Sequence, residues 1–132
     1  MPSGDSPARI DRVFRRLAGD LERWGALFLE VARSKDLPTV EQILGGLVEW
    51  MGSDLVDGWL YLPIPVFEAL NERSEELFQA CCAYLGQLRS GPVPLREEER
   101  RTQEAAIGAV LERVRAFVTL GVGRLRSEEL DE

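Results

Sequence analysis

The most reactive side chains in this sequence are two adjacent cysteines, Cys81 and Cys82. A cysteine becomes a nucleophile or a metal ligand when neighbouring positive charge lowers its pKa, and no histidine or lysine lies near this pair in the sequence. A disulfide between adjacent cysteines is strained and needs unusual backbone geometry. Because Cys81 also falls on the apolar face of a predicted helix, we expect both cysteines to be packing residues in or beside the core.

The sequence contains no histidine. This absence excludes histidine-ligated zinc sites, Ser-His-Asp and Cys-His catalysis, Glu-x-x-His di-iron sites and histidine pH switches. Arginine, tyrosine and carboxylate groups remain available for catalysis, but their positions do not bring an acid, a base and a nucleophile together. We therefore predict a protein that is not an enzyme and that has no catalytic residues, no metal and no cofactor.

Two clusters of like charge occur at helical spacing, one acidic and one basic. A straight helix exterior does not supply the convergent oxygens that calcium and magnesium require, and the basic cluster is interspersed with carboxylates, unlike a nucleic-acid footprint. The favoured interpretation of both clusters is solvated surface, with an acidic protein partner as the second choice for the basic one. The clusters are Glu68, Glu72, Glu75 and Glu76, and Arg9, Arg12, Arg16 and Arg23.

The charge is distributed unevenly along the 132 residues, which carry a formal net charge of −7. Binding to nucleic acid or to anionic lipid requires a cationic surface, so the net charge argues against both partners. Residues 1–35 carry seven basic and five acidic side chains, residues 36–95 carry two and nine, and residues 96–132 carry seven and nine. Since the acidic middle could meet the basic stripe of a second copy, this asymmetry suits self-association.

The first long segment has the strongest helical pattern. Ser6 and Pro7 are typical of an N-cap and a first helical residue. Seven apolar residues then alternate at spacings of four and three, which places them along one face, and Val13 and Leu27 widen this face toward a globular core. The seven residues are Ile10, Phe14, Leu17, Leu21, Trp24, Phe28 and Val31.

The second predicted helix begins near Thr39, because Thr39 and Gln42 match a capping box. Gly45 and Gly46 weaken a helix interior by about 1 kcal/mol each relative to alanine. Their presence indicates either close packing of a neighbouring helix or a locally weak helix. Ser53 could cap a short further turn after Gly52 ends this helix.

These patterns predict an all-α fold, a four-helix up-down bundle in one domain, 1–132. Narrow heptad seams also pair helices between chains, so a bundle completed or extended by homodimerisation is the alternative. The acidic segment 127–132 is predicted to be a disordered tail. The predicted helices cover approximately residues 6–34, 39–51, 66–89 and 95–125.

The segment 59–67 is an apolar, proline-containing elbow between two predicted helices. Its prolines prevent a continuous helix. The favoured interpretation is a buried elbow that closes the end of the core, but connectors are usually polar, so an exposed docking surface remains open as a second interpretation. In that second case the partner-binding residues are Trp59, Tyr61, Leu62, Ile64 and Phe67.

The leading hypothesis for function is a non-enzymatic protein–protein interaction module, acting as an adaptor, assembly factor or accessory subunit. We expect a protein partner, with a homo-oligomer favoured, and neither nucleic acid nor a transmembrane segment. The cytoplasm is the expected location, since the sequence shows no signal-peptide pattern. One alternative is a bundle that binds an apolar small molecule between its helices, and another is an amphipathic-helix coat of a granule or membrane surface. The pocket walls of the first alternative would be Trp24, Trp50, Trp59, Tyr61 and Phe67.

Overall fold

The structure is a computed structural model that describes residues 7–33, 36–89 and 96–130. All of its regular secondary structure within these ranges is helical, as the sequence predicts. Four helices are long, and a fifth, very short helix follows the second. The helices are α1 (Pro7–Arg33), α2 (Leu37–Gly52), α3 (Asp54–Gly58), α4 (Ile64–Arg89) and α5 (Glu97–Leu130).

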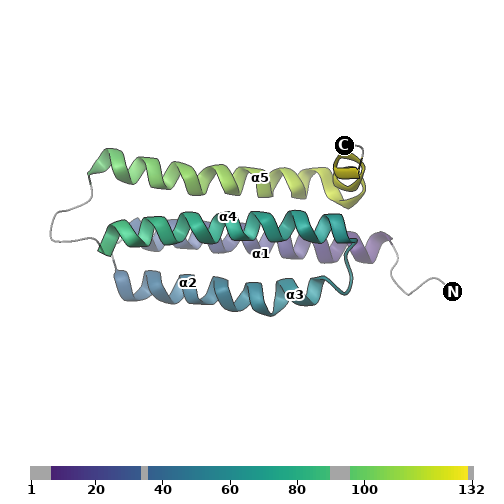
Figure 1. Cartoon of the computed structure of the whole chain (residues 1–132), viewed down its shortest axis with the longest axis horizontal. Helices are drawn as coiled ribbons and strands as arrows, with labels where there is room; N and C mark the ends of the chain where they lie inside the picture. Colours follow the sequence, from purple (N-terminus) through teal and green to yellow (C-terminus); the bar gives the residue numbers. More distant parts are fainter. Residues whose placement is uncertain (1–6, 34–35, 90–95, 131–132) are drawn as a thin grey trace.

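The four long helices lie side by side with nearly parallel axes (Figure 1). Helix α1 packs against α2 and α5, and α4 packs against the same two helices, so that α1 and α4 separate α2 from α5. Consecutive long helices run in opposite directions along the molecule, and α3 continues the line of α2 (Figure 1). The segment between α3 and α4 therefore lies at the same end of the molecule as the start of α1.

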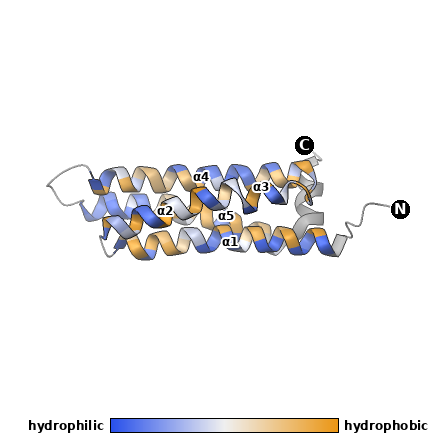
Figure 2. Ribbon diagram, turned by 90° about the horizontal axis from the view of Figure 1, so that it is seen from below, coloured by the Kyte–Doolittle hydropathy of each residue, from blue (hydrophilic) through white to orange (hydrophobic). Residues whose placement is uncertain are grey.

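The core forms where the apolar stripes of the long helices meet. Hydrophobic and hydrophilic residues alternate at short intervals along each helix (Figure 2), as expected for helices with one buried face. Phe28 of α1 and Tyr84 of α4 meet edge to face near the end of the core that is opposite the elbow, with ring centroids 5.9 Å apart. Of the apolar face predicted for α1, Phe14, Leu17, Leu21 and Phe28 are buried, whereas Leu27 is exposed.

The predicted start of the second helix is wrong by two residues. Helix α2 begins at Leu37, and Asp36 is its N-cap. The carboxylate of Asp36 accepts a hydrogen bond of 2.6 Å from the hydroxyl of Thr39, which lies in the first turn. Pro38 lacks an N–H and suits the first turn of a helix, so the helix begins before Thr39 instead of after it. Helix α4 likewise begins at Ile64, earlier than the predicted residue 66.

The two glycines inside α2 have different surroundings. A Cβ atom added to Gly46 would lie 2.5 Å from Cη2 of Trp24, whereas one added to Gly45 would meet open space. Gly46 therefore permits close packing of the Trp24 indole of α1 on the α2 backbone, which is the first of the two alternatives predicted for this pair. Ser53 is the N-cap of α3, but its hydroxyl donates to the backbone oxygen of Glu49 at 2.8 Å and does not cap α3.

Helix α5 extends beyond its predicted end at residue 125. The structure continues it to Leu130, where the sequence predicts a disordered tail over 127–132; residues 131 and 132 lie outside the described ranges. Arginine, leucine and glutamate dominate this last stretch and favour helix intrinsically, so helical backbone does not require an apolar face there. Residue 95, the predicted start of this helix, also lies outside the described residues, and the helix begins at Glu97.

Candidate interaction surface

The elbow between α3 and α4 is a compact series of turns. The backbone N–H groups of Trp59, Leu60 and Tyr61 each donate to the carbonyl oxygen three residues earlier, at 3.0–3.1 Å. The N–H of Leu62 donates to the carbonyl oxygen of Gly58 at 3.0 Å. The acceptors of these hydrogen bonds belong to α3, so the start of the elbow is held by the segment directly before it and not by a distant part of the chain.

The elbow directs some of its apolar side chains into the core and others into solvent. Leu62 and Val66 are buried, with exposed fractions of 6% and 0%, and they close the end of the core. Four other side chains point outward, and we call them the elbow patch. Their exposed fractions are 57% for Trp59, 70% for Leu60, 37% for Tyr61 and 60% for Ile64.

The five partner-binding residues predicted from the sequence therefore divide into two groups. Trp59, Tyr61 and Ile64 are exposed, while Phe67 is half-buried with its ring centroid 6.4 Å from that of Trp59. Leu62 is a correction, because its burial in the core makes it inaccessible to a partner. Sequence reasoning did not select Leu60, although it lies between the two exposed aromatic residues and carries the largest exposed fraction of the patch.

A row of arginines on α1 borders the elbow patch. The guanidinium of Arg9 lies over the ring of Tyr61, 5.1 Å from its centroid, which is a cation–π arrangement. Arg12 and Arg16 follow at helical spacing and, with Arg9 and Val13, line a hollow of about 270 Å³. Both are exposed, and neither forms an ion pair with a residue that the structure describes.

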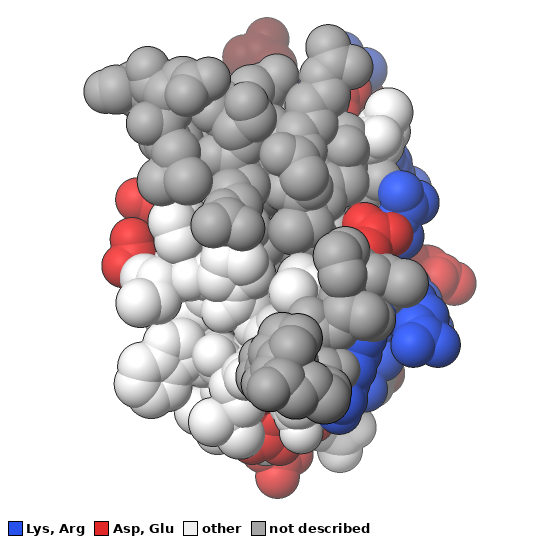
Figure 3. Space-filling model, turned by 90° about the vertical axis from the view of Figure 1, so that its right-hand side faces the viewer, with Lys and Arg blue, Asp and Glu red and all other residues white. Residues whose placement is uncertain are grey.

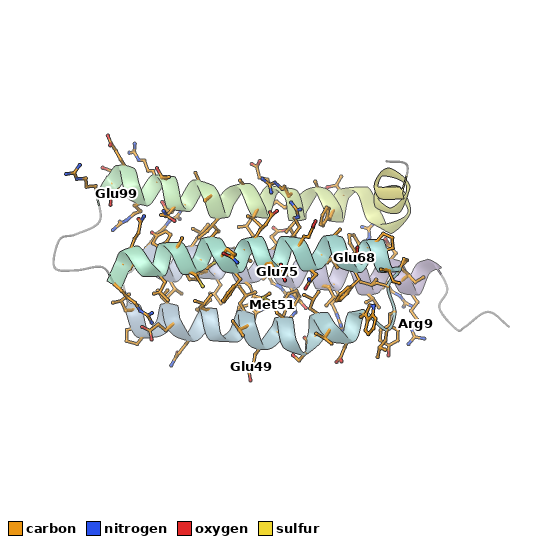
Figure 4. All side chains as sticks on the ribbon, in the orientation of Figure 1. Arg9, Glu49, Met51, Glu68, Glu75 and Glu99 are labelled. Carbon is orange, nitrogen blue, oxygen red and sulfur yellow. The ribbon has the colours of Figure 1, made fainter. Side chains whose placement is uncertain are left out.

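A row of carboxylates on α4 begins beside the same patch. Glu68 lies one turn after Ile64, Glu75 lies two turns further, and both are exposed. Within the described ranges neither of these two forms an ion pair, whereas Glu72 and Glu76 are both paired with Arg73. The end-on view in Figure 3 shows acidic residues on one side and mostly basic residues, with some acidic ones among them, on the other. In Figure 4 the labelled Arg9 and Glu68 lie toward this end of the bundle.

A second aromatic surface lies between α1 and α2. Trp24 and Trp50 line a hollow of about 330 Å³ together with Asp20, Arg23 and other residues. The indole N–H of Trp50 donates to Asp20 at 3.3 Å, and Arg23 is ion-paired with the same carboxylate. The sequence predicted one pocket that would combine these two tryptophans with the elbow aromatics. The structure instead places Trp24 and Trp50 in this hollow, while the elbow aromatics lie at the end of the bundle.

The two cysteines lie on α4, where the core meets its edge. Cys81 is fully buried and Cys82 is partly buried, and both are free thiols. Burial raises the pKa of Cys81 to about 12, with a smaller contribution from the neighbouring Cys82, and burial also raises the pKa of Cys82. Because the thiolate is the reactive form, this environment opposes nucleophilic chemistry and suits the packing role predicted for the pair.

A buried polar group lies at the opposite end of the core from the elbow. Tyr84 is fully buried, and its hydroxyl has no hydrogen-bond partner among the described residues. Burial raises the pKa of Tyr84, and the charge of Glu104 raises it further, while Arg100 and Arg33 oppose the change. Arg33 donates to Glu104 at 2.7 Å, which joins α1 to α5. These groups connect the helices, and they include no paired acid and base suited to catalysis.

The described residues contain no group of three or more cysteine, aspartate or glutamate side chains that could hold a metal ion. None of the helices in this part of the chain combines the length and the hydropathy needed to cross a bilayer. Comparisons with known proteins show no matching family model, no similar curated protein and no similar solved structure. The function must therefore be argued from the surfaces of this chain.

Proposed function

We propose that the protein is a non-enzymatic protein–protein interaction module, an up-down four-helix bundle that presents the elbow patch to a protein partner. The observation that carries this proposal is the exposure of Trp59, Leu60, Tyr61 and Ile64 beside a core that Leu62 and Val66 already close. An adaptor, an assembly factor or an accessory subunit would use such a surface. The start of the elbow backbone is hydrogen-bonded to carbonyl groups of α3, which pre-organises the patch for binding.

The composition of the patch supports a protein partner. Connectors in folded proteins are usually polar, and contiguous exposed apolar surface marks interaction sites. Tryptophan and tyrosine are enriched among residues that dominate binding energy, where truncation of one side chain costs about 2 kcal/mol or more. Full burial of a large aliphatic side chain contributes about 1.5–3 kcal/mol. Four such side chains in one short segment can therefore anchor a specific contact.

The proposal is tested by comparing two double variants in affinity purification from a native extract, with mass spectrometry of the captured proteins. Trp59→Ala with Tyr61→Ala removes the aromatic part of the patch. Leu27→Ala with Val48→Ala removes exposed apolar side chains elsewhere on the bundle and is the matched control. We expect the variant at Trp59 and Tyr61 to lose specific partners and the control variant to keep them. The melting temperatures of both variants should stay close to that of the parent. Equal capture by both variants and the parent would contradict the proposal.

The hollow between α1 and α2 supports a second candidate function, the binding of an apolar small molecule. Its volume of about 330 Å³ lies at the lower end of the range typical of ligand sites, roughly 300–1,000 Å³. Quenching of tryptophan fluorescence on titration with an apolar dye tests this candidate. Because Trp50 lines the same hollow, the expected quenching should weaken in a Trp24→Phe variant and stay unchanged in Trp59→Phe. Quenching that depends only on Trp59 would place the dye on the elbow patch instead.

A further inference from the structure

The elbow patch has charges of opposite sign on its two sides. The arginine row of α1 begins at Arg9, which is stacked on Tyr61. The carboxylate row of α4 begins at Glu68, one helical turn beyond Ile64. Figure 3 shows acidic residues on one side of this end and mostly basic residues, with some acidic ones among them, on the other side. A partner that covers this patch must therefore present negative charge on one side and positive charge on the other.

A second copy of the same chain meets this requirement. In a two-fold symmetric contact each molecule offers the same surface, and residue pairs occur twice. The two-fold axis lies in the contact plane, perpendicular to the line that joins the two charged rows. A half-turn about this axis brings the arginine row of one copy opposite the carboxylate row of the other. The apolar side chains then meet at the centre, and the charged rows form the rim, which is the usual anatomy of a protein interface.

We infer that the elbow patch binds the elbow patch of a second copy, with the α1 arginines of each copy facing the α4 glutamates of the other. This inference rests on the proposed function and specifies its partner. An anionic lipid surface is disfavoured, because Glu68 lies one turn beyond Ile64 of the patch and the chain carries a formal net charge of −7. A standard interface buries about 800 Å² per partner, roughly a tenth of the 7971 Å² surface of this chain, so the contact must extend beyond the four side chains of the patch.

Four residues of the two charged rows are suited to a test because they are exposed and form no ion pair with described residues of their own chain: Arg12, Arg16, Glu68 and Glu75. Their reversal should leave the monomer fold intact. One variant carries Arg12→Glu and Arg16→Glu, and the other carries Glu68→Arg and Glu75→Arg. Each variant would place like charges opposite each other in its own homodimer, whereas a mixed dimer of the two variants regains opposite charges in both rows.

Sedimentation velocity of the full chain, over a concentration series and at low and high salt, measures the effect. We expect the parent to form a dimer that weakens with salt. Each variant should dissociate with a constant raised roughly a hundredfold or more, because like charges in an interface cost several kcal/mol. Equimolar mixing of the two variants should restore a dimer. Circular dichroism of each variant alone should match that of the parent, which separates loss of association from loss of folding.

Three results would overturn the inference: a parent that stays monomeric across the concentration series, a dimer that both charge variants keep, or variants whose mixing restores nothing. A monomeric parent leaves the proposed function intact if Trp59→Ala with Tyr61→Ala still loses a captured protein, since the patch then serves a different partner. If the variant with Trp59→Ala and Tyr61→Ala keeps both the dimer and every captured protein, the proposed function itself is rejected.

Discussion

The tryptophans of this chain occupy two regions that differ in how far they bury the indole side chain. Between α1 and α2, Trp50 is 6% exposed, its indole N–H donates to Asp20, and Trp24 packs on the backbone at Gly46. At the elbow, Trp59 is 57% exposed, and its ring contacts Phe67 on one side. In the first region the indoles join two helices, whereas in the second the indole contributes little to the contacts within the chain.

This difference shows that an apolar cluster in the sequence has structural meaning only with its backbone context. A helix partner, a facing glycine and a carboxylate within reach make a tryptophan part of the fold. A turn that is hydrogen-bonded to the preceding helix and already directs Leu62 into the core leaves its other side chains available. The first region should therefore govern folding, and the second should govern association.

The largest expected effect separates the two regions directly. Trp50→Ala should lower the free energy of unfolding by about 3–5 kcal/mol, because it removes a buried aromatic side chain and leaves a cavity. Trp59→Ala should change it by only about 0.5 kcal/mol, as for other surface substitutions. Urea unfolding followed by circular dichroism measures both values, at one low protein concentration so that dissociation does not contribute. Equal losses in the two variants would remove the distinction between the regions.

A smaller effect is expected from the glycines of α2, which test how tightly the first region packs. Gly46→Ala introduces a methyl group 2.5 Å from Cη2 of Trp24, and such overpacking costs about 1–3 kcal/mol. Gly45→Ala has open space around it and should stabilise the helix by about 1 kcal/mol. In thermal unfolding experiments we therefore expect the melting temperature to fall for Gly46→Ala and to rise for Gly45→Ala. A rise for both would mean that Trp24 moves freely.

A pH-dependent effect is expected from the burial of the Cys81 thiol in the core. Burial raises the pKa of Cys81 from its ordinary 9.0 to about 12, so the unfolded chain loses this proton at lower pH than the folded chain. The stability that the neutral thiol provides is present below pH 9 and is lost as the pH rises from 9 toward about 12. Tyr84, whose pKa is also raised, adds a loss of the same sign.

Stability measured by urea unfolding at several alkaline pH values tests this expectation. Cys81→Ala should make the decline with pH shallower by at most about 1.4 kcal/mol per pH unit, because one proton fewer is linked to unfolding. Trp59→Ala is the control from the elbow and should keep the decline of the parent. If Cys81→Ala also keeps that decline, water reaches the thiol in the folded chain.

Much of the fold could be predicted from the sequence, because helix periodicity depends on local spacing. The spacing of apolar residues in α1 correctly predicted that Phe14, Leu17, Leu21 and Phe28 are buried. The interruption of the helix between α2 and α4 was also correctly predicted. The exact helix starts were less predictable. Two caps compete at the start of α2, Asp36 and Thr39, and the fixed backbone angle of Pro38 favours the earlier one.

The candidate site could be located from the sequence but not resolved into its parts. The composition of 59–67 identified the elbow, yet composition does not state which side chains point inward. That direction depends on the turn geometry at Gly58, where the backbone approaches Leu17 of α1 closely. The pairing of Arg9 with Tyr61 and of Trp50 with Asp20 joins residues far apart in the chain, so no local pattern could have indicated either contact.

The position of α5 has a consequence for the kinetics of folding. This helix packs between α1 and α4, and its ion pairs Arg33–Glu104 and Glu22–Arg115 connect residues separated by 71 and 93 positions. The chain must lose the conformational entropy of such long loops before the contacts form and stabilise it, so a high mean sequence separation of contacts slows folding. During synthesis the apolar surface of α1 and α4 that α5 covers stays exposed to solvent until α5 has been made. We therefore expect this chain to fold more slowly than helical proteins of similar size whose contacts are local.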